Sequence, residues 1–201
     1  MVNVLLSSYD FNNEYCYFRL HKIIKPGMSV CIIPFSHDDA VYEDIEKFEE
    51  IYNPDRYDSD FCRLERAFRD FGVTKMRVIH PKDNDYMIEH KIKNADILFF
   101  TGGDPVKTMK RLQPLHYLIK SFDGIVMGAS AGAMIQVHNF VIASEGYEHS
   151  YHRGLCLTPP NIDVIVHYTP CEHIYLMMCK SMEDRPDVNL YAISDGDCII
   201  I

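Results

Sequence analysis

The chain has 201 residues, of which 47% are hydrophobic and 24% are charged. These fractions are typical of a globular protein and exclude a disordered chain, a collagen-like chain and a coiled-coil rod. The length predicts a single domain over residues 1–201. The formal net charge of −9 argues against nucleic acid and anionic membranes as partners, because both require basic patches.

The cysteines and the N-terminus indicate the cellular compartment. Seven cysteines are present, and no two occur as Cys-x-x-Cys, so we expect reduced thiols in a cytoplasmic protein. No basic residue precedes the short apolar run at residues 2–6, so we expect no signal peptide. No stretch approaches about 18 apolar residues, so we expect no membrane span.

Short apolar runs alternate along the chain with segments of helical character. Strands are expected at residues 2–6, 29–34, 76–79, 95–100, 125–127, 139–143, 164–167, 191–193 and 198–201. Helices are expected at residues 40–52, 61–71, 86–93, 106–112, 115–121 and 133–136. This alternation predicts an α/β fold, a three-layer α/β/α sandwich with a mostly parallel central sheet. A ligand site is then expected at the carboxyl ends of the strands.

Residues 43–60 form the most acidic segment of the chain. They carry eight carboxylates, with Lys47 and Arg56 as the basic residues. A cation site or an acidic docking face is one interpretation. We favour the other, a solvated helix and loop.

The strongest motif is Gly128-Ala129-Ser130-Ala131-Gly132. It matches the Gly-x-Ser-x-Gly pattern, in which a nucleophilic serine projects from a sharp turn between a strand and a helix. The motif follows the buried run at residues 124–127 and precedes a segment of helical character, which is the context that it requires. We interpret Ser130 as a nucleophile. The alternative is a turn of small residues that lets a strand and a helix pack closely.

A second motif, Thr101-Gly102-Gly103-Asp104-Pro105, directly follows an apolar strand. Paired glycines let backbone amides face a ligand, and Asp104 and Pro105 suit the cap and first turn of a helix. We predict that Gly103 and Ala131 supply the amides of an oxyanion hole and that Gly102 and Asp104 bind substrate. The alternative is an ordinary loop between a strand and a helix. The motif lacks the Lys-Ser/Thr of a phosphate loop, so we do not expect nucleotide binding.

A serine nucleophile needs a base and a residue that orients the base. His167, the preferred base, ends the apolar run that begins at Val164, which puts it at the ligand-binding end of a strand. The alternative is a partly buried histidine that bonds to a backbone group. Asp195 follows another predicted strand and is the preferred orienting acid, although an Asp-Gly turn explains it equally well. Asp163 and Glu172 remain alternatives for that role.

The segment at residues 145–153 is polar and aromatic and contains His149, His152 and Arg153. The two histidines could hold a metal, but no supporting ligand pattern accompanies them. We therefore expect a mobile surface loop, with a lid as one possibility. Arg153 is a candidate for substrate binding from this loop.

The motifs Phe-Phe-Thr-Gly-Gly-Asp at residues 99–104, Gly-Ala-Ser-Ala-Gly-Ala at 128–133 and Val-His-Tyr at 166–168 resemble a known family. The sequence is similar to the serine peptidases of the alpha-aspartyl dipeptidase (dipeptidase E) and cyanophycinase family. The resemblance covers nearly the whole chain and implies a fold similar to class I glutamine amidotransferases. It also implies a Ser130–His167–Asp195 triad, with Asp195 where the dipeptidase carries a glutamate.

One segment departs from that family. The dipeptidase reads its substrate's aspartate with arginines downstream of the histidine, whereas residues 171–180 contain only Lys180 as a basic residue. We therefore expect no strong preference for an N-terminal aspartate.

The sequence thus predicts a serine-type hydrolase of peptide or isopeptide bonds. It needs no metal or organic cofactor, acts on a small peptide or amide substrate, and is a monomer or a homodimer. The alternatives are an esterase or amidase, or a catalytically silent binding protein of the same fold.

Overall fold

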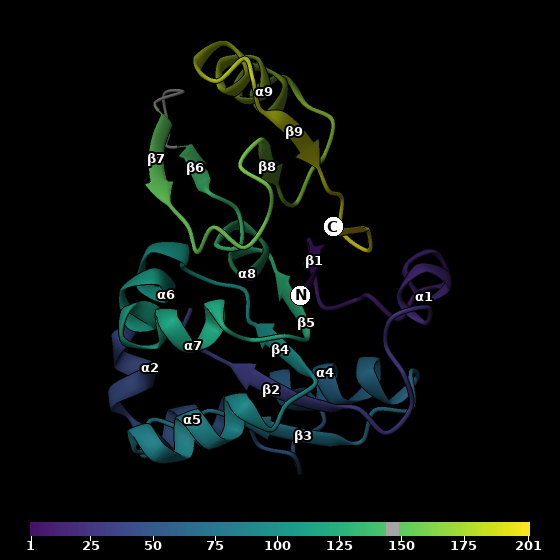
Figure 1. The fold of residues 1–201 in the computed structure, drawn as a ribbon, viewed down its shortest axis with the longest axis vertical. Coiled ribbons are helices and arrows are strands. Elements are labelled where there is room, and N and C mark those ends of the chain that lie inside the picture. The colour runs from purple at the N-terminus through teal and green to yellow at the C-terminus, as the bar shows by residue number, and fades with distance from the viewer. Residues whose placement is uncertain (144–148) are drawn as a thin grey trace.

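The computed structural model describes residues 1–143 and 149–201. Its main sheet has six strands in the order β10-β1-β5-β4-β2-β3 (Figure 1). The strands are β1 (Val2–Leu6), β2 (Ser29–Ile33), β3 (Lys75–Val78), β4 (Ile97–Phe100), β5 (Ile125–Ala129) and β10 (Cys198–Ile200). Every neighbouring pair is parallel except β1 and β10, which are antiparallel. The mostly parallel sheet agrees with the prediction.

Helices cover both faces of this sheet. Successive residues of β1 alternate between two cores, with Val4 and Leu6 in one and Leu5 in the other. The first core is closed by α1 (Glu14–Leu20), α3 (Ile45–Ile51) and α4 (Asp60–Arg69). The second is closed by α5 (Asp85–Lys93), α6 (Pro105–Leu112), α7 (His116–Lys120) and α8 (Ala131–Met134), with a 3₁₀ turn, η1 (Gln113–Leu115), between α6 and α7. These layers are the predicted three-layer α/β/α arrangement.

Two short sheets and a helix are attached beside the carboxyl end of β5 (Figure 1). One sheet pairs β6 (Asn139–Ala143) with β7 (His149–Arg153) in antiparallel fashion. The other pairs β8 (Ile162–Ile165) with β9 (Asn189–Ala192) in parallel, and α9 (Glu172–Asp184) connects these two strands. Phe140, Val164 and Ile193 join this part of the chain to the second core.

Several local predictions were wrong. The helix expected at residues 40–52 is interrupted at Asp44, which ends α2 (Asp39–Glu43) in an extended conformation and caps α3 with its side chain. The segments of α1 and α9 were not predicted as helices. Within the described part of the chain, no helix has the length and apolar character needed to cross a bilayer.

The segment expected to be a loop at residues 145–153 is also different. Residues 149–153 form β7, in which His152 is paired with Phe140 of β6 and stacks on its ring, while residues 145–148 lie outside the described residues. β7 pairs only with β6 in its sheet, and its residues are exposed or half-buried. It therefore lacks the apolar alternation by which a strand is usually found.

Candidate active site

Ser130 lies in the tight turn between β5 and α8. Its backbone angles are φ 52° and ψ −115°, which is a sparsely populated region for a residue with a Cβ. The turn requires a glycine on each side of Ser130, at positions 128 and 132. A Cβ at Gly128 would lie 2.1 Å from the carbonyl oxygen of Gly132, and one at Gly132 would lie 2.2 Å from the carbonyl oxygen of Phe100. The spacing of the motif is thus a packing requirement of this turn.

The predicted base and acid are adjacent to this serine. His167 follows β8 with a φ of 55°, and its Nε2 atom is 2.9 Å from Ser130 Oγ. The Nδ1 atom of the same ring is 2.7 Å from Oδ1 of Asp195, which lies in the turn between β9 and β10. The three side chains thus form one continuous line of hydrogen bonds.

Ser7, which no sequence motif indicated, forms hydrogen bonds with both Asp195 and His167. Its hydroxyl donates to Asp195 Oδ1 at 2.7 Å and accepts a hydrogen bond from the backbone amide of His167 at 2.6 Å. The hydrogen bond from Ser7 is the main reason that the pKa of Asp195 lies below the ordinary value of an aspartate. Ser7 directly follows β1, so the rule that directs attention to the carboxyl ends of parallel strands would have found it.

The other candidate acids lie elsewhere. Asp163 is fully buried and forms an ion pair with Arg185. Glu172 begins α9 and is exposed. In this structure, Asp195 is therefore the carboxylate that meets the His167 ring.

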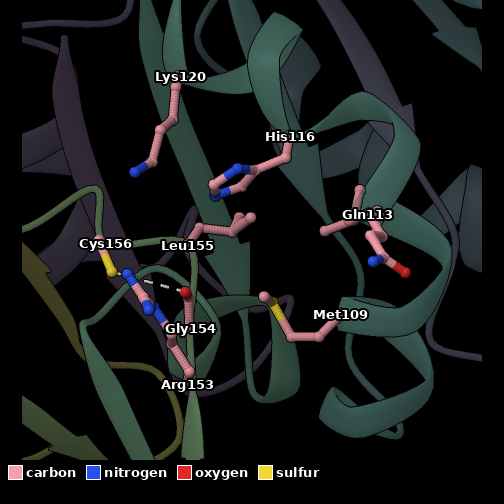
Figure 2. A pocket seen from close by; sticks show the side chains of 9 residues that line it. Met109, Gln113, His116, Lys120, Arg153, Gly154, Leu155 and Cys156 are labelled. Carbon is pink, nitrogen blue, oxygen red and sulfur yellow. Dashed lines mark hydrogen bonds between the residues drawn. The ribbon is translucent and has the colours of Figure 1, made fainter.

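Arg153 does not reach the Ser130 cavity. It stands at the end of β7 and lines a different cavity, together with residues of α6 and α7 (Figure 2). Arg153, the candidate for substrate binding, therefore lies away from the Ser130 cavity in this structure.

The loop between β4 and α6 lies against Ser130. A Cβ at Gly102 would be 3.3 Å from the Cβ of Ser130, and the Gly102 amide donates to the hydroxyl of Tyr9 at 3.0 Å. Gly103 has a φ of 142°, and a Cβ there would lie 2.6 Å from the carbonyl oxygen of Ser36. Within residues 1–143 and 149–201, no backbone carbonyl accepts a hydrogen bond from the amide of Gly103 or Ala131.

Asp104 caps α6, as its position before Pro105 predicted. Its Oδ1 atom accepts hydrogen bonds from the amides of Val106 and Lys107 at 2.8 and 3.0 Å. The carboxylate is thus engaged with its own helix. Asp104 is also not among the residues that line the cavity at Ser130.

Ser130 opens into a cavity of about 320 Å³. The residues that line it are Ser7, Ser8, Tyr9, Asp60, Arg63, Gly102, Gly103, Ala129, Ser130 and His167. These residues come from the loop after β1, the first turn of α4, the last residue of β5 and the loops after β4, β5 and β8.

Two charged side chains of opposite sign in this cavity come from the first turn of α4. Arg63 Nη1 is 3.9 Å from Asp60 Oδ1, and the guanidinium lies 5.5 Å from the centre of the Tyr9 ring. Burial raises the pKa of the Asp60 carboxyl and that of the Tyr9 hydroxyl. No pattern in the sequence indicates this pair. Asp60 and Arg63 lie on a helix that packs beside the site, whereas the strand rule indicates only residues that follow the end of a strand.

Comparisons with known proteins identify the family. The model of peptidase family S51 matches residues 52–201. No curated protein sequence matches the chain. A solved structure assigned as a peptidase E protein of Listeria monocytogenes EGD-e is 18% identical, with a TM-score of 0.67, and the match covers 100% of this chain and 93% of that one. A peptidase from an acI-B1 Actinobacterium is 17% identical, with a TM-score of 0.66, and the match covers 100% of this chain and 82% of that one.

These two structures are similar to this chain in fold. The family match covers well over half of the sequence and includes Ser130, His167 and Asp195. It confirms the resemblance on which the prediction of a peptidase depended. The chain belongs to peptidase family S51, and it is a hydrolase of the serine peptidase type.

Proposed function

We propose that this peptidase cleaves short peptides through an acyl-enzyme formed on Ser130, with His167 as the base and Asp195 as the acid that orients it. The main support is the 2.9 Å contact between His167 Nε2 and Ser130 Oγ. A neutral imidazole that donates from Nδ1 to Asp195 has a free lone pair on Nε2. That lone pair can accept the hydroxyl proton as Ser130 attacks the substrate's carbonyl carbon.

The reaction then proceeds in two steps, acylation of Ser130 and hydrolysis of the acyl-enzyme. Attack by Oγ gives a tetrahedral intermediate, whose collapse breaks the C–N bond as His167 returns the proton to the leaving amine. A water molecule next gives a proton to His167 and attacks the acyl carbon, and the Ser130 hydroxyl leaves with that proton. The products are an amine and a carboxylic acid.

The amides of Gly103 and Ala131 are the proposed oxyanion donors. Ala131 directly follows the nucleophile, and Gly103 lines the same cavity. The neighbouring amide of Gly102 already donates to Tyr9, which favours Gly103 as the second donor. Two donors aimed at the developing negative charge stabilise the transition state more than the ground state.

A fluorophosphonate probe tests this proposal directly, because it labels only an activated serine. We expect the probe to label Ser130 in the wild type and to leave Ser130→Ala unlabelled. Ser8→Ala is the matched control, since Ser8 lines the same cavity without contacting His167. A folded wild-type protein that takes up no label would contradict the proposal and favour a silent binding protein.

Turnover of a peptide substrate provides a second test. Ser130→Ala and His167→Ala should each lower kcat by about a thousandfold or more, and the double variant should be little worse than either one. This non-additivity is expected because the two side chains act in a single proton transfer. Additive losses would show that they act separately.

We also propose that Asp60 and Arg63 contact the first residue of the substrate, the Asp60 carboxylate facing its ammonium group and the Arg63 guanidinium facing a carboxylate on its side chain. Arg63 is about half exposed and already faces Asp60, so its attraction for a second carboxylate is partly offset. We therefore expect only about a twofold to fivefold preference for aspartate as the first residue of a dipeptide.

A panel of dipeptides that differ only at the first residue measures this preference. Arg63→Gln should remove it. The control Arg66→Gln should not, because Arg66 stacks on Tyr57 and does not line the Ser130 cavity. A preference of a hundredfold or more, or one that survives the loss of Arg63, would show that another group recognises the substrate.

A further inference from the structure

A second cavity, of about 270 Å³, lies on the α6 and α7 side of the main sheet. One wall comes from α6, η1 and α7, and the other from residues 153–156, which are the last residue of β7 and the segment after it. It shares no lining residue with the cavity at Ser130. Its volume is somewhat below the roughly 300–1,000 Å³ of pockets that hold drug-sized molecules, so a ligand here must be small.

The wall formed by residues 153–156 is fixed by the backbone. The amides of Gly154, Leu155 and Cys156 donate to the carbonyl groups of His138, Ile135 and Val137 at 2.9, 2.7 and 3.2 Å. A Cβ at Gly154 would lie 2.2 Å from the Val137 carbonyl oxygen, so only glycine permits this close approach. The cavity is therefore largely formed before any ligand binds, which lowers the free-energy cost of binding.

The floor of the cavity is apolar and its rim is basic. Leu112 and Leu155 are fully buried behind it, and the half-buried Met109 and Cys156 supply its accessible apolar surface. Figure 2 shows His116 and Lys120 extending from α7 on one side of Leu155, and Arg153 on the other side. Within the described ranges, no carboxylate lines the cavity and neither Lys120 nor Arg153 has an ion-pair partner.

This arrangement defines the chemistry of a ligand. A guanidinium can form two parallel hydrogen bonds with a carboxylate or a phosphate, and a lysine ammonium adds a point charge to the same anion. The accessible surface of Met109 and Cys156 can cover a hydrocarbon chain but offers nothing to a second charge. We propose that this cavity binds a small organic anion with one charged head and an apolar body, the head between Lys120 and Arg153 and the body on Met109 and Cys156.

Calorimetric titration with octanoate tests the proposal, since this probe has one carboxylate and one hydrocarbon chain. We expect saturable binding of one octanoate per chain. Acetate lacks the chain and 1-octanol lacks the charge, so each should bind at least about tenfold more weakly. The Lys120→Gln/Arg153→Gln double variant should lose about fourfold to 25-fold in affinity, because each exposed charge contributes about a twofold to fivefold effect and the two effects multiply.

Two further variants complete the test. Lys22→Gln/Lys75→Gln removes two positive charges outside the cavity and should leave octanoate affinity unchanged. Ser130→Ala should also bind octanoate normally, which separates this cavity from the catalytic site whether or not the proposed triad is correct. The inference is overturned if the wild type does not bind octanoate, if 1-octanol binds equally well, or if the Lys120/Arg153 double variant binds as the wild type does while keeping its melting temperature.

Discussion

At the scale of single residues, Ser7 links two segments that are far apart in the sequence. Its hydroxyl contacts the carboxylate of Asp195 and the backbone amide of His167. Ser7 therefore affects both the orientation of the imidazole and the charge of the acid behind it. It is a positioning residue, because its side chain contacts the base and the acid and acts on Ser130 only through them.

Replacing Ser7 by alanine should raise the pKa of Asp195. The hydrogen bond from Ser7 stabilises the ionised carboxylate, so its loss moves the pKa upward toward that of an ordinary aspartate. A ¹³C titration of the Asp195 carboxyl carbon measures this shift. The exposed Ser121→Ala is the control, since within the described residues the Ser121 hydroxyl bonds only to the carbonyl group of Leu118 in its own segment. An unchanged or lower pKa in Ser7→Ala would contradict this role.

At the scale of structural elements, the turn between β5 and α8 depends on two close backbone contacts. Gly128→Ala and Gly132→Ala would each place a methyl group about 2 Å from a carbonyl oxygen, and a backbone carbonyl cannot move aside as a flexible side chain can. Each variant should lose more than the about 1–3 kcal/mol that is typical of overpacking, and should lose labelling at Ser130.

Urea unfolding of Gly128→Ala and Gly132→Ala measures the stability loss, with Gly27→Ala as the matched control. Gly27, unlike Gly128 and Gly132, has a positive φ, of 85°, and a Cβ at this position would have no atom within 4 Å. Gly27→Ala should therefore lose only about 1–2 kcal/mol, the cost of a left-handed conformation, and should retain labelling. A stable and labelled Gly132→Ala would mean that the turn tolerates a methyl group.

The buried ion pair between Asp163 of β8 and Arg185, which follows α9, connects two elements of the attached region. Arg185→Met leaves the Asp163 carboxylate without its partner in a fully buried position, so we expect a loss of about 3–5 kcal/mol in unfolding free energy near neutral pH. Lys180→Met is the control, because its pair with Asp184 is exposed and contributes less than about 1 kcal/mol.

The loss in Arg185→Met should become smaller as the pH falls. Burial already raises the pKa of Asp163, and removal of Arg185 raises it further. A carboxyl whose pKa is higher in the folded state than in the unfolded state takes up a proton first in the folded state, which favours folding at acidic pH. Denaturant unfolding at a series of pH values measures this trend, and a loss that grows toward acidic pH would contradict it.

The elements that could be predicted from sequence are those whose burial requires a recognisable pattern of apolar residues. β1, β2, β4 and β5 are buried on both faces and appear as continuous apolar runs. α9 leaves no such pattern, since Met177 and Ser181 are its only buried residues. The same distinction applies to the candidate site. Ser130, His167 and Asp195 all follow strands and could be found, whereas Asp60 and Arg63 reach the cavity on a helix.

At the scale of the whole molecule, the candidate site is assembled from both ends of the chain. Ser7 follows β1 and Asp195 precedes β10, and these two strands are neighbours at one edge of the main sheet, with Leu6 paired to Cys198. Ser130 follows β5, which pairs with the other side of β1. The geometry around Ser130 thus depends on three adjacent strands that are far apart in the sequence.

This dependence predicts that the site is lost together with the fold. The rate of fluorophosphonate labelling at Ser130 should fall with urea at the same midpoint as the far-UV circular dichroism signal, because the strands that align the site belong to the sheet that forms the two cores. The background of this labelling is measured with the same probe on a protein whose Ser130 is already acylated. Labelling that disappears well before the circular dichroism signal would mean that β10 and the turn at Asp195 separate from the sheet first. The sheet edge at β10 would then unfold before the rest of the sheet, in line with the half-exposed side chains of His167 and Asp195 beside it.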